Sequence, residues 1–257
     1  MSEPAFTPEA SETTQAAERP IDVLMPAHNE GSSIGVTIRE FHEVASERLG
    51  IAVRFVVAED GSTDDTCDVI RSVGEDLPVE LLSFPERKGY SKAVVDGFRA
   101  TSGDVVCFID SDGQLDPADL PRLLRRLEGR DLVVGYRVHR NDTMLRRAMS
   151  GAFKALYRML FPVRLRDPSC PYLVIRRDAL ERVLEGSPGI LKQGFWWEFN
   201  ARAAAHRLDV AEVPVRHRRR TAGETQVYRL EKIPRIAYEH ILGLFALRRE
   251  LQRLASA

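Results

Sequence analysis

The sequence predicts an α/β fold built on a mostly parallel, doubly wound sheet. Short apolar runs alternate with stretches of helical period through the first half of the 257 residues, which is typical of such a sheet. The apolar run at residues 105–109 is rich in β-branched and aromatic side chains, as strands covered on both faces are. Asp110 and Asp112 follow that run directly, at the edge where open α/β sheets bind their ligands.

Two strand–helix units are expected at the start of the folded chain. The first strand covers residues 21–25 and ends at Pro26, and the second covers residues 51–57. The helix between them is indicated by apolar side chains that recur at the helical period, namely Ile34, Ile38, Phe41 and Ala45. After the second strand, Ser62 or Thr63 can cap the next helix.

Three more strands complete the regular first half. They are expected at residues 79–84, 105–109 and 132–135. A helix over residues 91–100 connects the first two of these strands. Pro117 begins the helix that precedes the last one, because proline is favoured at the first helical position.

The second half of the chain is less regular. Its expected elements are a helix at residues 144–160, a strand at 172–175, a helix at 177–184, a helix that starts near residue 194, a strand at 210–215 and a basic loop at 216–220. Without a repeat or a linker, we expect one domain over residues 21–228. Residues 1–20 are rich in Glu, Thr, Ala and Pro and predict a disordered tail. An amphipathic helical segment is expected over residues 229–257.

The composition is that of a globular protein, with 44% hydrophobic and 29% charged residues. The formal net charge of −1 argues neither for nor against an anionic partner. Cys67, Cys107 and Cys170 are too few and too scattered for a disulfide framework, which fits a reducing cytosol. No run approaches the roughly 18 apolar residues of a membrane span, and no signal-peptide pattern occurs. We therefore expect a cytoplasmic protein that is soluble or bound to a membrane surface.

Asp110 and Asp112 are candidate ligands of a divalent cation. Two hard oxygen donors on a turn with Gly113 can hold Mg²⁺ or Mn²⁺, whose other positions go to water and phosphate oxygens. A solvated turn with two acids is the alternative, because the pattern is short.

Four motifs stand in order along the chain: residues 26–30 (Pro-Ala-His-Asn-Glu), residues 59–64 (Glu-Asp-Gly-Ser-Thr-Asp), residues 110–112 (Asp-Ser-Asp) and the arginines of residues 216–220. Together they resemble the family 2 inverting glycosyltransferases, which use nucleotide-sugar donors. The sequence is most similar to the branch of dolichol-phosphate mannosyltransferases and polyprenyl-phosphate glycosyltransferases. This resemblance implies the GT-A fold, a Rossmann-like, mostly parallel sheet flanked by helices.

The resemblance also implies a donor site made from these motifs. The residues that would bind the nucleotide are Pro26, Ala27, Asn29, Glu30, Asp60, Asp110 and Ser111, with Asp60 at the base or ribose. Asp110, Asp112 and Gln114 would hold Mg²⁺ or Mn²⁺ against the diphosphate. Catalysis would depend on Asp112, Arg218 and Arg220, because a cation and arginines stabilise the negative charge that develops on the leaving diphosphate.

The implied acceptor is a polyprenyl or dolichyl phosphate, and no nucleic acid is implied. Arg146 or Arg147 with Ser150 would face the lipid phosphate, and Arg137 is a further candidate. A phosphate monoester has a second pKa of about 6 and is largely ionised at neutral pH, so it needs no general base.

Two other functions remain open from the sequence. The first is a soluble or peripheral transferase of the same family that acts on a hydroxyl group of a saccharide or small molecule. That acceptor would require a base, and Glu198, between aromatic residues, is the candidate. An acid at the start of a packed aromatic helix is the alternative reading of Glu198. The second function is a non-catalytic, nucleotide-binding scaffold.

The C-terminal segment has the character of a surface helix. From residue 216 onward there are ten Arg or Lys against four Glu. Its apolar stripe consists of Leu230, Ile233, Ala237, Ile241, Leu244, Phe245, Leu247 and Leu251. Such a helix can lie on an anionic membrane, or it can pack on its own sheet or on a partner subunit.

Overall fold

The structure is a computed structural model. It describes residues 20–138, 144–186, 188–191, 194–218 and 233–254, without the side chains of residues 144–150, 152 and 233–238.

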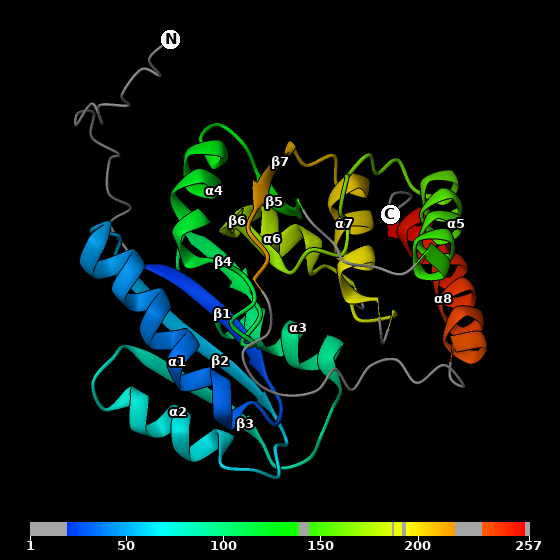
Figure 1. The fold of residues 1–257 in the computed structure, drawn as a ribbon. Helices are drawn as coiled ribbons and strands as arrows, with labels where there is room; N and C mark the ends of the chain where they lie inside the picture. Colours follow the sequence, from blue (N-terminus) through cyan, green and yellow to red (C-terminus); the bar gives the residue numbers. More distant parts are fainter. Residues whose placement is uncertain (1–19, 139–143, 187, 192–193, 219–232, 255–257) are drawn as a thin grey trace.

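A mixed seven-stranded sheet in the order β3-β2-β1-β4-β6-β5-β7 forms the centre of the described chain (Figure 1). The strands are β1 (Ile21–Ala27), β2 (Val53–Asp60), β3 (Val79–Phe84), β4 (Val105–Ile109), β5 (Leu132–Arg137), β6 (Tyr172–Arg176) and β7 (Val210–Val215). β6 runs antiparallel to both of its neighbours, and the other pairs are parallel. This confirms the predicted mostly parallel sheet.

Helices lie on both faces of this sheet (Figure 1). They are α1 (Gly31–His42), which continues as the π-helix η1 (Glu43–Arg48), α2 (Thr66–Gly74), α3 (Tyr90–Ala100), the short 3₁₀ helix η2 (Pro117–Asp119), α4 (Leu120–Leu127), α5 (Met144–Leu160), α6 (Arg177–Val183), α7 (Phe195–Ala205) and α8 (Ile233–Leu254). Each predicted helix is present. All three cysteines are free, as the sequence predicts.

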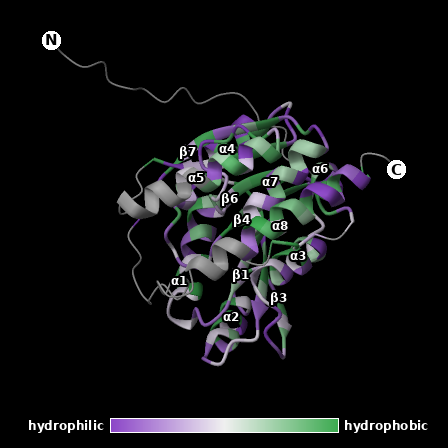
Figure 2. Ribbon diagram, turned by 90° about the vertical axis from the view of Figure 1, so that its right-hand side faces the viewer, coloured by the Kyte–Doolittle hydropathy of each residue, from purple (hydrophilic) through white to green (hydrophobic). Residues whose placement is uncertain are grey.

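The sheet separates two apolar cores, and alternate strand residues contribute to each. Val23 and Met25 of β1 belong to the cluster that contains side chains of α1, α2 and α4. Leu24, between them, belongs to the cluster that contains side chains of α3, α6, α7 and α8. Both faces of the sheet are therefore buried, which explains the nearly continuous apolar strands. Figure 2 shows hydrophobic residues in these strands and hydrophilic ones in many outward-facing loops and helix faces.

Three local predictions were wrong. The second strand, expected at residues 51–57, covers Val53–Asp60, so Glu59 and Asp60 belong to the strand itself. Pro26 does not end β1, which continues to Ala27. The pairing of β1 with β4 ends at Leu24, so the missing amide of Pro26 removes no hydrogen bond to that neighbour. Ser62 and Thr63 do not cap α2, which starts at Thr66. They contact the loop after β1 instead.

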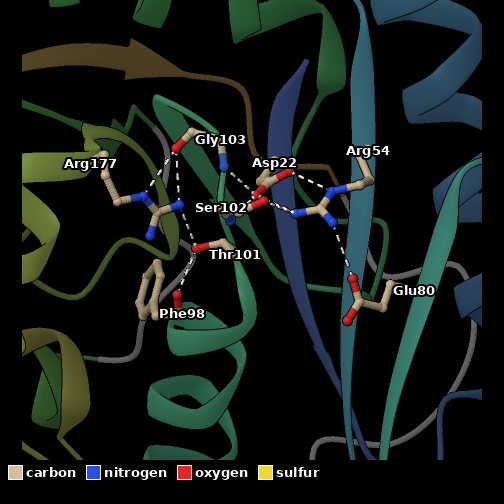
Figure 3. A network of polar contacts seen from close by, with 8 residues as sticks. All are labelled: Asp22, Arg54, Glu80, Phe98, Thr101, Ser102, Gly103 and Arg177. Atoms are coloured by element: carbon tan, nitrogen blue, oxygen red, sulfur yellow. Dashed lines mark hydrogen bonds and ion pairs between the residues drawn. The ribbon is translucent and has the colours of Figure 1, made fainter. Parts of the chain in front are cut away.

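The amino-terminal edge of the sheet is held by a buried carboxylate (Figure 3). Asp22, 1% exposed, accepts hydrogen bonds from Nε and Nη2 of Arg54 at 2.8 and 2.7 Å. It also accepts from the amides of Ser102 and Gly103, in the turn before β4. Arg54 in turn contacts Glu80 of β3 at 3.2 Å. One network thus joins four adjacent segments at the edge opposite the predicted site.

Candidate active site

Three of the predicted motifs meet at the carboxyl edge of the sheet. β1 pairs in parallel with both β2 and β4, so the segments that follow these strands leave the sheet at the same edge. The hydroxyl of Thr37 in α1 donates to the carbonyl oxygen of Ser111 at 3.1 Å and ties α1 to the aspartate turn. Residues 26–30, 59–64 and 110–112 are therefore neighbours, as the parallel sheet predicts.

The loops after β1 and β2 are bound to each other. Asn29 adopts a left-handed backbone conformation with φ 55°. Its amide donates to Ser62 Oγ at 3.0 Å, and its side-chain oxygen accepts from the amide of Thr63 at 2.9 Å. The amide of Glu30 donates to Thr66 Oγ1 at 2.9 Å. Pro26 and Ala27 are buried at the end of β1, just before this joined pair of loops.

Asp60 holds the loop that leads into α3. Its two carboxylate oxygens accept hydrogen bonds from the amides of Lys88 and Gly89, at 2.6 and 2.9 Å, and the residue is 4% exposed. The next residue, Gly61, has φ +64°, and a Cβ atom there would lie 2.6 Å from the amide nitrogen of Arg87. This turn therefore requires glycine. Contact of Asp60 with a base or ribose stays a prediction.

Asp110 and Asp112 lie on the turn directly after β4. The pKa of the Asp110 carboxyl is raised to about 7, first by burial and then by the charge of Asp112. Asp112 Oδ1 accepts from the amide of Gln114 at 3.1 Å, and Gly113 between them has φ +70°. Two carboxylates that repel each other fit a divalent cation, which would relieve the repulsion.

A cation at this turn would need further ligands from the substrate or solvent. Within the described ranges, no group of three or more His, Cys, Asp or Glu side chains could hold a metal ion. A site with only two carboxylate ligands from the described protein suits Mg²⁺ or Mn²⁺, because these ions keep coordination positions for water and phosphate oxygens. Gln114 as a ligand stays a prediction, and its side-chain amide donates to the carbonyl oxygen of Arg218 at 3.3 Å.

The loop after β7 lies against the aspartate turn. Leu115 forms an isolated antiparallel bridge with His217, and the amide of Arg218 donates to the carbonyl oxygen of Gln114 at 2.7 Å. The guanidinium of Arg218 pairs with Asp116 at 2.8 Å and with Glu40. Arg218 is therefore close to the turn but neutralised by carboxylates. Arg220 lies outside the described residues.

The predicted acceptor residues are only partly described. Arg137, at the end of β5, binds both oxygens of Asp167 at 2.7 and 3.0 Å and Ser169 Oγ at 2.9 Å. Its side chain is 14% exposed and interacts electrostatically with Asp110. The other candidates, Arg146, Arg147 and Ser150, belong to α5, but their side chains lie outside the description.

Glu198 occupies a structural position. It is 1% exposed and accepts hydrogen bonds from the amides of Gly189 and Leu191 at 2.8 and 2.7 Å. Arg202 donates to it at 2.9 Å. This environment favours the packing role that the sequence also allowed, because both oxygens already bind donors within the protein. The base prediction receives no support from this geometry.

The family model described as Glycosyl transferase family 2 matches residues 22–184. The chain belongs to glycosyl transferase family 2. Two relatives, from Salmonella paratyphi B and Salmonella newport, are named undecaprenyl-phosphate 4-deoxy-4-formamido-L-arabinose transferase. Each is 26% identical over 227 residues, which cover 87% of this chain and 67% of the relative.

Solved glycosyltransferase structures share the fold. Mannosyl-3-phosphoglycerate synthase from Rubrobacter xylanophilus has a TM-score of 0.62 at 17% identity, over 91% of this chain and 75% of that one. Glucosyl-3-phosphoglycerate synthase from Mycobacterium tuberculosis, in complex with Mn²⁺ and UDP-glucose, has a TM-score of 0.57 at 24% identity, over 90% and 79%. These likenesses confirm the GT-A fold class, and the family makes this protein a glycosyltransferase.

Sequence reasoning missed two side chains of this glycosyltransferase that meet at the aspartate turn. Tyr90 is the first residue of α3 and Trp196 the second residue of α7, and the hydroxyl of Tyr90 donates to Asp110 Oδ1 at 3.2 Å. No local signal distinguishes either residue from an ordinary helix-start aromatic. They are 106 positions apart, so only the folded chain shows that they meet.

Proposed function

We propose that this glycosyltransferase transfers a sugar from GDP- or UDP-sugar to a polyprenyl or dolichyl phosphate, with inversion at the anomeric carbon. The reaction would use Mg²⁺ or Mn²⁺. The observation that carries the proposal is the close pair Asp110 and Asp112, at the same edge as residues 26–30 and 59–64 and bridged to the loop of Arg218.

The chemistry requires charge stabilisation at the leaving group. A divalent cation at Asp110 and Asp112 would supply positive charge to the departing diphosphate. The guanidinium of Arg218 would leave Asp116 and bind oxygens of the diphosphate instead. A guanidinium can bind phosphate through two parallel hydrogen bonds. Since both groups act where charge develops, they would stabilise the transition state more than the bound donor.

A phosphate acceptor is compatible with the residues considered for acceptor binding, Glu198 and Arg137. Its second pKa of about 6 leaves it ionised at neutral pH, so it attacks without a general base. The buried, fully bonded position of Glu198 agrees with such an acceptor. Arg137, near Asp110, is the described candidate for contact with the acceptor phosphate. The names of the Salmonella relatives, which contain undecaprenyl phosphate, also support this acceptor class.

An acceptor screen tests the proposal. The protein is incubated with labelled GDP- and UDP-sugars and Mn²⁺, and separately with polyprenyl phosphate or with water-soluble acceptors such as phosphoglycerate and free sugars. We expect label to enter the organic phase only with the lipid phosphate. Transfer to a water-soluble acceptor alone would establish the alternative enzyme. No transfer from any donor, together with donor binding, would indicate the non-catalytic scaffold.

The described part of α8 supports contact with an anionic membrane, and we propose that this membrane surface is the cytoplasmic one. None of the described helices is long and apolar enough to cross a bilayer. α8 packs Leu244, Leu247 and Leu251 into the core and exposes Ile241 and Phe245 of the predicted stripe, together with Leu242. Ile241, Leu242 and Phe245 are 39%, 51% and 45% exposed. Figure 2 looks at the molecule from this side, where α5 and α8 lie.

The positive charge of two arginines favours an anionic lipid surface as the partner of the exposed face of α8. Arg249 and Arg253 follow Leu242 and Phe245 at helical spacing, and both arginines are exposed. Apolar side chains beside arginines on one helix face are typical of helices that lie in the interface of anionic bilayers. Such a contact would place the protein where a polyprenyl phosphate presents its head group.

Replacement of one exposed side chain tests the membrane contact. Phe245→Ser should lower partitioning to phosphatidylglycerol vesicles about tenfold or more, since burial of such a side chain is worth about 1.5–3 kcal/mol. Sedimentation of the protein with vesicles measures this. Val36→Ser, at a 70% exposed position of α1, is the matched control and should bind like wild type. Equal binding of wild type and Phe245→Ser, or equal binding to neutral phosphatidylcholine, would refute the contact.

A further inference from the structure

Two hydrogen bonds connect α7 to the first aspartate of the site. Trp196 Nε1–H donates to the hydroxyl oxygen of Tyr90 at 3.0 Å, and the Tyr90 hydroxyl lies 3.2 Å from Asp110 Oδ1. The indole N–H is a donor only, and a tyrosine hydroxyl has a single proton. Because Tyr90 accepts from Trp196, its proton is directed to Asp110. For an ionised Asp110, the chain therefore runs from the indole N–H through Tyr90 to the carboxylate.

The indole of Trp196 has little freedom to move. The residue is 7% exposed, and its ring centroid lies 4.4 Å from that of Phe108 in an edge-on contact. It also packs on Phe195 and Phe199, at 5.0 and 5.5 Å. Phe108 precedes Asp110 by two residues in the same strand end. The packing therefore holds the indole and the aspartate turn together.

The position of Tyr90 is also fixed by hydrogen bonds of the residues before and after it. The amides of Lys88 and Gly89, just before it, bind Asp60. Ser91, just after it, donates from its hydroxyl to the carbonyl oxygen of Leu191 at 2.9 Å. The hydroxyl thus projects from a helix start that is anchored on both sides, as precise positioning requires.

We propose that Tyr90, held by Trp196, is a positioning residue that orients the Asp110 carboxylate toward the divalent cation. The inference rests on the metal site of the proposed function. The hydrogen bond uses one lone pair of Oδ1 and fixes the plane of the carboxylate, which leaves Oδ2 and the remaining lone pair in a defined direction. Hydrogen-bonded partners of metal ligands act in this way, and their loss typically costs 10- to 100-fold in metal affinity.

Mn²⁺ titration of the full chain, followed by electron paramagnetic resonance of free Mn²⁺, tests the inference without any turnover. Tyr90→Phe removes only the hydroxyl and should raise the Kd for Mn²⁺ about 10- to 100-fold. Trp196→Phe keeps a packed ring but loses the N–H, and should raise the Kd in the same direction by a smaller factor. Tyr136→Phe loses a hydroxyl that accepts from Arg166 and should bind Mn²⁺ like wild type.

The outcomes separate this inference from the metal site itself. If Asp112→Ala abolishes Mn²⁺ binding while Tyr90→Phe and Trp196→Phe bind like wild type, Tyr90 does not position Asp110 and the proposed function stands. If Asp112→Ala binds like wild type, the metal site is wrong and the inference falls with it. A melting temperature lowered in Tyr90→Phe with an unchanged Kd would show a purely structural role and overturn the inference. Should Tyr90→Phe not fold, the Kd of Trp196→Phe decides.

Discussion

At the scale of residues, two aspartates at opposite edges of the sheet serve opposite purposes in this protein. Asp22 receives two bonds from Arg54 and two from backbone amides. Burial alone would raise the pKa of Asp22, but these donors outweigh it and lower the pKa below the usual value. The pKa of Asp110 is raised to about 7, first by loss of solvation and then by the charge of Asp112, and the hydrogen bond from Tyr90 does not offset this. The hydrogen-bond and charge partners thus distinguish Asp22, which stabilises the fold, from Asp110, which is a candidate metal ligand.

Asp22→Asn should lower the free energy of unfolding at pH 7 by about 1–3 kcal/mol, because Arg54 and two amides lose a charged acceptor. A carboxyl with a lowered pKa stabilises the fold fully above its unfolded pKa of about 4. That contribution is lost as the pH falls through the lower pKa of the folded state. The difference between wild type and variant should therefore shrink at acidic pH.

Urea unfolding of both proteins from pH 7 downward measures this difference. Asp68→Asn is the matched control, since the Asp68 side chain is 82% exposed and pairs with Arg71 on the helix surface. The control should lose at most about 0.5 kcal/mol. A loss in Asp22→Asn that is as small as in the control, or that does not change with pH, would contradict the role given to Asp22.

At the scale of elements, local sequence signals predicted what forms but not what the elements touch. Helical period identified α5 and strand composition identified β4, with the bounds that the structure shows. The antiparallel direction of β6, the bridge of Leu115 to His217 and the meeting of Tyr90 with Trp196 all depend on distant segments. Local propensity contains no information on such pairings, so they could not be predicted.

Another contact between distant segments that local sequence signals did not predict is the ion network that joins α7 to α8. Arg202, 1% exposed, donates to Glu198 at 2.9 Å and to both oxygens of Glu250 in α8 at 3.0 and 3.1 Å. Arg202→Met should lower the free energy of unfolding by about 3–5 kcal/mol, since Glu198 would remain buried without its cation. Chemical denaturation measures the loss.

The surface substitution Arg71→Met is the control for Arg202→Met. Arg71 has a 62% exposed side chain and pairs with the exposed side chain of Asp68 on the surface of α2. Its loss should cost less than about 1 kcal/mol. If both variants are equally stable, the network does not hold α8 on the domain.

At the scale of the whole molecule, the order of the motifs predicted the architecture and the edge at which the site lies. The mostly parallel sheet brings residues 26–30, 59–64 and 110–112 together because their strands are adjacent and parallel. The sequence could not show that Arg218 is paired with Asp116 and Glu40, or that Glu198 is locked in an ion pair. Those ion pairs depend on which charged side chains the fold brings within reach of each other.

The central proposal is that the aspartate pair binds a nucleotide-sugar through a divalent cation, and calorimetric titration of the donor tests it most directly. GDP- and UDP-sugars are titrated into wild type and Asp112→Asn, with Mn²⁺ and with EDTA. We predict that one donor class binds wild type with Mn²⁺, and that either EDTA or Asp112→Asn weakens binding at least about tenfold, which corresponds to about 1.4 kcal/mol. Equal donor affinity in all four conditions would contradict a metal-bridged donor at Asp110 and Asp112.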